Sequence, residues 1–187
     1  MRYLFYTTMF TVAVTSAAAA SAETCPPGAD QSRTLDTLVL SAQNAATEAE
    51  GRAISNQMWA QWTQAPDSYA QELLDTGMER REVYDFDAAH NAFSALVAYC
   101  PAYAEGYNQR AFVNFLRGDY AAALPDLERA IDITPQHVAA RTGLALTLMG
   151  LERNGEAALV LREALAMNPW LGERNLLPML EAQEDAL

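Results

Sequence analysis

Histidine and cysteine, the side chains that most often hold metals or act as nucleophiles, are scarce in this chain of 187 residues. Its two histidines are His90 and His137, and neither begins the HxxxH or HExxH pattern of a helical metal site. Its two cysteines, Cys25 and Cys100, have no clustered histidines around them, and no basic neighbour would favour a reactive thiolate. The sequence therefore predicts no metal ion and no catalytic thiol.

Carboxylates are abundant, but their spacing does not indicate catalysis. Pairs such as Glu79 with Glu82 fall on stretches that are expected to be exposed helices, where they are most simply solvated surface. No Gly-x-Ser-x-Gly motif, glycine-rich phosphate loop or Cys-x-x-Cys pair occurs. We expect a protein that is not an enzyme and that needs no cofactor.

The charge of the chain limits the classes of partner that it is expected to bind. The formal net charge is −12, and all 12 basic residues are arginine. Without lysine there is no Schiff-base chemistry and no phosphate-binding P-loop. Such an acidic chain is not expected to bind nucleic acid or an anionic lipid surface, because both are themselves negatively charged.

The elements that organise the chain repeat every 34 residues. Pro101, Pro135 and Pro169 are separated by this interval, and the same register aligns small and large apolar residues. Small residues suit places where two helices approach closely, and a proline suits the end of a helix. The aligned sets are Ala89, Ala123 and Ala157; Phe93, Leu127 and Leu161; and Leu96, Ala130 and Ala164.

This register resembles the tetratricopeptide repeat (TPR), a helix-turn-helix unit of about 34 residues. The resemblance implies an all-α fold, a right-handed α-solenoid of antiparallel helix pairs, with repeats over 70–103, 104–137 and 138–171. Asp85 and Asp119 are predicted to cap the second helix of their units. Pro125 falls inside the second helix of the middle unit and predicts a kink near Ala121.

Residues 1–22 have the composition of a secretory signal peptide, with a small-x-small cleavage pattern at Ala20-Ser21-Ala22. We therefore expect a periplasmic protein with no membrane span after cleavage; the alternative is an uncleaved N-terminal membrane anchor. Residues 23–33 are expected to form a flexible leader. In an exported chain Cys25 and Cys100 could form a disulfide, or could both stay free.

Further helices are predicted before and after the three repeats. Residues 34–66 are predicted to form a helical hairpin whose Trp59 and Trp62 share an apolar face. This hairpin could be a degenerate extra repeat or a cap for the open end of the stack. Residues 172–187 are predicted to form a closing helix on the last repeat, with Trp170 sealing that joint.

The resemblance places the first helix of each unit on a concave, partner-binding face. Chaperone-binding members of the family hold a terminal carboxylate there with Lys, Asn and Arg, a set that this chain lacks at the matching positions. The expected function is a non-catalytic scaffold in the bacterial envelope that binds an apolar or amphipathic segment of another protein; the alternative is a self-associating protein whose N-terminal segment fills the groove. The predicted groove residues are Leu74, Met78, Arg81, Asn108, Phe112, Phe115, Thr142, Leu146 and Met149, with Glu105 at a further groove position.

Overall fold

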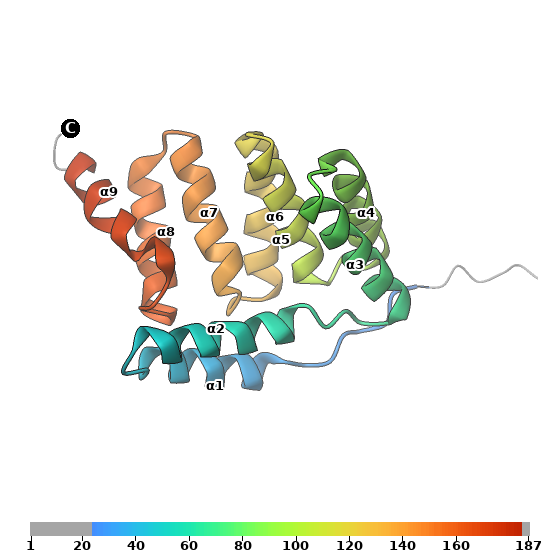
Figure 1. Ribbon diagram of the computed structural model, residues 1–187, viewed down its shortest axis with the longest axis horizontal. Helices are drawn as coiled ribbons and strands as arrows, with labels where there is room; N and C mark the ends of the chain where they lie inside the picture. The colour runs from blue at the N-terminus through green and yellow to red at the C-terminus, as the bar shows by residue number, and fades with distance from the viewer. Residues whose placement is uncertain (1–23, 185–187) are drawn as a thin grey trace, which may run out of the picture.

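The computed structural model describes residues 24–184, so the predicted signal peptide lies outside the described residues. Over this part the chain is entirely helical apart from turns and loops (Figure 1). No helix within it combines the length and apolar character needed to cross a bilayer. The helices are α1 (Ser32–Gln43), α2 (Glu48–Trp62), α3 (Ser68–Glu82), α4 (Phe86–Tyr99), α5 (Ala104–Leu116), α6 (Tyr120–Ile133), α7 (Val138–Gly150), α8 (Asn154–Met167), the 3₁₀ helix η1 (Gly172–Leu176) and α9 (Leu177–Glu184).

Helices α3 to α8 form three sequential antiparallel pairs that stand in one row, and α9 closes the row against α8 (Figure 1). Small residues at the predicted places let the helices approach. A Cβ atom added to Gly77 would lie 2.3 Å from the ring of Phe93, and Ala89, Ala123 and Ala157 are fully buried. The all-α, TPR-like fold is confirmed.

Each pair turns tightly between its two helices. One residue at each turn has a positive φ angle: Tyr84 (62°), Gly118 (75°) and Glu152 (61°). These positions are 34 residues apart, so the turn geometry repeats even where the glycine does not. The predicted caps are confirmed, because Asp85 accepts the Ala88 N–H and Asp119 accepts the Ala122 N–H.

Pro125 lies inside α6, which runs without interruption from Tyr120 to Ile133. Its side chain is exposed, so the ring meets solvent instead of a neighbouring helix. The kink expected near Ala121 stays a prediction.

The N-terminal hairpin is helical, as expected, but it does not sit beyond α3 as an extra repeat or an end cap. Helices α1 and α2 run crosswise beneath the row, along the edge where the repeats are joined to one another (Figure 1). Leu35 and Met58 of the hairpin share a buried cluster with Val138, at the start of α7. The apolar stripes of the hairpin therefore cover the inter-repeat loops.

Trp170 packs against the N-terminal hairpin, and not between the closing helix and the last repeat as predicted. A Cβ atom at Gly51 would lie 2.4 Å from the Trp170 side chain, and the Trp170 indole N–H donates to the Ala45 carbonyl oxygen at 3.2 Å. The tryptophan thus fastens the hairpin to the C-terminal end of the stack. The closing helix itself packs on the last repeat through Leu180, which is buried.

Candidate functional site

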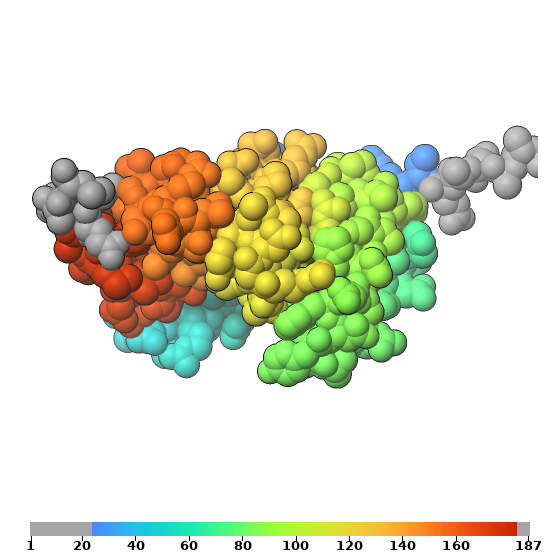
Figure 2. All heavy atoms as spheres, turned by 90° about the horizontal axis from the view of Figure 1, so that it is seen from above, coloured from blue at the N-terminus to red at the C-terminus, as the bar shows by residue number. Residues whose placement is uncertain are grey.

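A pocket of about 330 Å³ opens between α5 and α7, the first helices of the second and third units. Seen from above, the first pair (green) projects on the same side of the row on which α2 (cyan) emerges, so this side is hollowed (Figure 2). Trp59 of α2 and Glu173 of η1 both contribute to the wall of the pocket. The rest of the lining is mainly apolar: Ala111, Phe112, Phe115, Leu127, Ala139, Gly143, Leu146 and Leu171, with Arg81, Asn108, Gln109, Thr142 and Thr147.

Phe112 is the most exposed apolar side chain of this lining, at 42%. The guanidinium carbon of Arg81 lies 5.1 Å from the centre of its ring, within the range of a cation–π contact. Phe115 is turned toward Tyr120, with ring centres 5.3 Å apart. The pocket therefore presents one free aromatic face beside a fixed cation.

The structure brings together six of the nine predicted groove residues at this pocket. They are Arg81, Asn108, Phe112, Phe115, Thr142 and Leu146. Met78 and Met149 are half-buried and pack against the cores of their own units.

Leu74 does not belong to the surface, and its assignment to the groove was wrong. It is fully buried in a cluster with Phe93 and Val113. The equivalent positions of the second and third units carry Asn108 and Thr142, which line the pocket, whereas the branched apolar side chain of Leu74 packs inward. No partner can contact Leu74 without opening the core.

A buried chain of hydrogen bonds runs behind the pocket, and the sequence did not predict it. Arg81 Nη1 donates to Gln109 Oε1, and Gln109 Nε2 donates to Glu105 Oε1. Glu105 Oε2 lies 2.8 Å from His137 Nε2. His137 Nδ1 accepts the backbone N–H of Ala140, so the proton of a neutral ring is on Nε2 and is donated to Glu105.

This chain is almost fully enclosed. Glu105, Gln109 and His137 are each at most 1% exposed. Asn108 adds a further bond to Glu105 Oε2 at 3.1 Å, and Trp62 of α2 stacks on the His137 ring with centres 4.3 Å apart. Glu105 is therefore a structural group inside the molecule, not the groove residue that was expected. Its partner His137 is 32 residues away in the sequence, so a helical pattern alone could not reveal this contact.

The electrostatics of the site indicate binding, not proton transfer. Burial lowers the pKa of Arg81, while the charges of Glu105 and then Glu82 oppose this shift, and the group remains a cation at neutral pH. Within residues 24–184, no group of three His, Cys, Asp or Glu side chains is arranged to hold a metal ion. The arrangement can hold an apolar side chain and fix its orientation.

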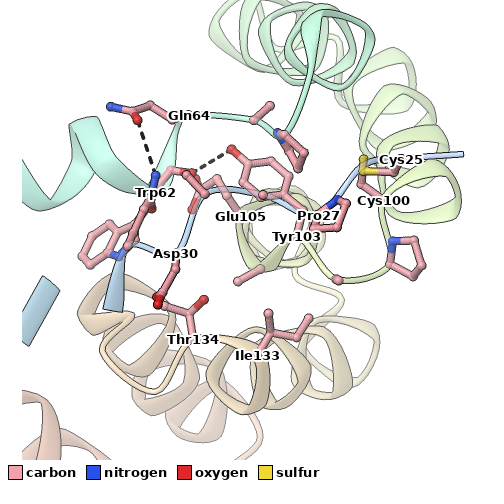
Figure 3. Close-up of a pocket in the computed structure, with 18 of the residues that line it drawn as sticks. Cys25, Pro27, Asp30, Trp62, Gln64, Cys100, Tyr103, Glu105, Ile133 and Thr134 are labelled. Atoms are coloured by element: carbon pink, nitrogen blue, oxygen red, sulfur yellow. Dashed lines mark hydrogen bonds between the residues drawn. A yellow bond between two sulfur atoms is a disulfide. The ribbon is translucent and has the colours of Figure 1, made fainter. Parts of the chain in front are cut away.

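A second cavity, of about 970 Å³, lies on the inter-repeat edge, away from the concave pocket. The leader, the end of α2 and the loops before α5 and α7 surround it, and the disulfide between Cys25 and Cys100 lies at one end (Figure 3). The Tyr103 hydroxyl crosses it to donate to the Trp62 carbonyl oxygen at 2.7 Å. Burial raises the pKa of this phenol far above its ordinary value, with the nearby charges of Glu105 and Asp75 adding to the shift.

Comparison with known proteins identifies the repeats. Two tetratricopeptide repeat models match, one over residues 74–138 and the other over residues 115–171. A tetratricopeptide repeat protein 36 homolog from Nematostella vectensis is 40% identical over 71 residues, which are 38% of this chain and 39% of the relative. A TPR repeat-containing protein from Rhizobium etli is 29% identical over 96 residues, 51% of this chain and 47% of the relative. The matches span less than half of these curated relatives.

Solved structures show the same fold. The first TPR domain of Spaghetti, bound to an HSP90 peptide, superposes with a TM-score of 0.60 at 20% identity, over 63% of this chain and 94% of that one. A double mutant of MamA superposes with a TM-score of 0.59 at 17% identity, over 85% and 88%. The repeat register and the helix pairs agree with both family models, which together span residues 74–171: this chain is a tetratricopeptide repeat protein, of a family of non-catalytic interaction domains.

Proposed function

We propose that this protein is an exported scaffold of the bacterial cell envelope that holds an apolar or amphipathic segment of another protein in its concave face. The observation that carries the proposal is the open pocket at Phe112. Phe112 is 42% exposed and borders a cavity of about 330 Å³, whereas Ala111 and Leu127 of the same lining are buried. A pocket of this size accepts one large apolar side chain of a partner.

The chain does not fill this pocket with its own described N-terminal segment. The leader lies on the inter-repeat edge, and from the hairpin only Trp59 lines the pocket. This placement of residues 24–66 counts against the alternative in which the leader or the hairpin occupies the groove. A partner segment would enter between α5 and α7, where Arg81 and Glu173 both belong to the lining.

The test is direct peptide binding. A library of apolar and amphipathic peptides is selected on the immobilised full chain, and the affinity of the best peptides is measured by fluorescence anisotropy. Phe112→Asp places a charge in the pocket and should weaken binding at least about tenfold, the loss expected for a central apolar contact. Leu159→Asp is the matched control, because Leu159 is also exposed, at 56%, but lies on α8 outside the pocket. Equal affinity of both variants would exclude the concave face as the binding surface.

The envelope location has separate support, from the apolar N-terminal stretch and its Ala20-Ser21-Ala22 pattern. The expected mature N-terminus is Glu23, and N-terminal sequencing of protein recovered from a periplasmic fraction tests it. Protein that keeps Met1 and sediments with membranes would favour the anchored alternative.

A further inference from the structure

One covalent bond holds the leader on the repeats. Cys25 lies in the leader and Cys100 at the end of α4; their Cα atoms are 5.1 Å apart although 75 residues separate them in the sequence. Cys100 is buried, at 1% exposure, in the core of the first unit, and Cys25 packs partly against that core. The disulfide therefore joins an otherwise peripheral segment to the inside of the first repeat.

Other attachments of the leader are weak. From Pro26 to Asp30 every residue is exposed. Asp30 bonds only to the neighbouring Ser32, and within the described chain no hydrogen bond joins residues 24–30 to the repeats. The nearest such bond comes from Gln31, whose side-chain amide donates to Gln64 at 3.4 Å, in an exposed position. Between Cys25 and α1 the leader is thus a strap fixed at its two ends.

The strap spans the second cavity instead of filling it. Residues 24–32 form one wall of the cavity of about 970 Å³, and segments 98–105 and 133–137 form the opposite walls (Figure 3). A packed segment would leave no space of this size beneath it. The position of the strap therefore depends on the bond at Cys25 more than on contacts along its length.

The hairpin that follows the strap is held independently. Trp62 stacks on His137, Trp170 packs on Gly51, and Asn168 donates to the Ser55 hydroxyl at 2.8 Å. These contacts join α2 to His137 and to the third repeat, and none of them involves Cys25 or Cys100. Loss of the disulfide would leave α1 and α2 in place and release only the strap.

We infer that the Cys25–Cys100 disulfide is a redox latch, and that its reduction releases residues 24–30 and opens the cavity on the inter-repeat edge. A dithiol supplies the two electrons. One of its thiolates attacks the more accessible sulfur, that of Cys25, and Cys100 leaves as a thiolate that takes up a proton. The second thiol of the reductant then displaces Cys25 from the mixed disulfide. The products are two free cysteine thiols and the oxidised reductant, so atoms and electrons balance.

NMR relaxation of the full chain, before and after dithiothreitol, tests the latch. In the oxidised protein the amides of Thr24, Gly28 and Ala29 should be ordered; on reduction their order parameters should fall from about 0.85 to below about 0.6. The Ile133 methyl groups should at the same time become more accessible to a soluble paramagnetic probe. The double variant Cys25→Ser/Cys100→Ser should match the reduced protein and should not respond to dithiothreitol.

Two results would overturn this inference. If the strap amides stay ordered after reduction, contacts and not the disulfide hold the strap. If the amide signals of Leu144 and Leu161, in the core of the third repeat, lose their chemical-shift dispersion on reduction, the disulfide is needed for the stability of the whole fold. Retained dispersion in this core together with a released strap is the expected result.

Discussion

Two surfaces of this molecule are built from similar residues, but one is buried within the protein and the other is open to solvent. Beneath the hairpin, Trp62 and His137 meet face to face, and both carboxylate oxygens of Glu105 have hydrogen-bond partners. On the concave face, Phe112 and Arg81 also meet, yet the space beside them stays open. The first surface is covered by another part of the same chain, whereas the second borders an open pocket. This difference separates an aromatic residue that serves the fold from one that is available for binding.

The strongest test of this comparison uses two residues of α5. Glu105→Ala would remove the acceptor of three buried donors, on His137, Asn108 and Gln109. We expect a loss of about 3 kcal/mol in the free energy of unfolding, measured in urea, because buried polar groups would be left without partners. Phe112→Ala, two helical turns further along α5, should change stability by less than about 0.5 kcal/mol.

Glu105→Gln sharpens this test, since an amide keeps the shape and one acceptor oxygen but also adds donors to a site that is rich in donors. Its expected loss lies between those of the two alanine variants. A similar loss for Glu105→Ala and Phe112→Ala would show that the closed and open surfaces do not differ in the way described.

A smaller effect is expected where the hairpin meets the C-terminal end. Gly51→Ala would place a Cβ atom 2.4 Å from Trp170, so the hairpin must shift. Overpacking of this kind should cost about 2 kcal/mol in the free energy of unfolding. Gly172→Ala is the control, because nothing lies within 4 Å of the added atom. An unchanged melting temperature for Gly51→Ala would show that the hairpin is only loosely attached.

The smallest effect concerns Asp67, which joins the hairpin side to the first repeat. It accepts the Ala70 N–H at 2.8 Å and the Tyr99 hydroxyl at 2.7 Å, and these bonds lower its pKa below the ordinary 3.8. The folded state therefore binds this proton less readily than the unfolded state. The resulting stability is present above the ordinary pKa and is lost as the pH falls through the lowered value.

Asp67→Asn should therefore be less stable than the parent near neutral pH, and this difference should shrink as the pH drops below 3.8. Urea unfolding across that range measures it. A difference that is constant with pH would show that the charge of Asp67 contributes nothing beyond its capping oxygen.

The repeats could be predicted from the sequence because their contacts are local. Gly77 meets Phe93 within one unit, and Asp85 and Asp119 each cap the helix that follows them, so a period of 34 residues carries the information. The hairpin could not be placed in this way. Its position depends on pairs such as Trp170 with Ala45 and His137 with Trp62, which are distant in sequence and occur once.

The residues of the candidate site also fall into those that the repeat register predicted and those that it could not. Six groove residues followed from the repeat register, since equivalent positions face the same side of each unit. Leu74 failed because the register specifies a position and not the direction that a particular side chain takes. Trp59 and Glu173 were missed because they come from outside the repeats, and only the crosswise hairpin and the C-terminal segment bring them to the pocket.

The crosswise course of the hairpin has a mechanical consequence. Repeat stacks in which each unit touches only its neighbours can flex like a spring, since small rotations add up along the row. Here α1 and α2 bridge from the first repeat to the end of the third, so a change in curvature would have to slide Trp170 off Gly51. The width of the concave face is therefore fixed before a partner binds. A partner segment that fits it would bind more tightly, because little free energy would be spent on changing the shape of the repeats.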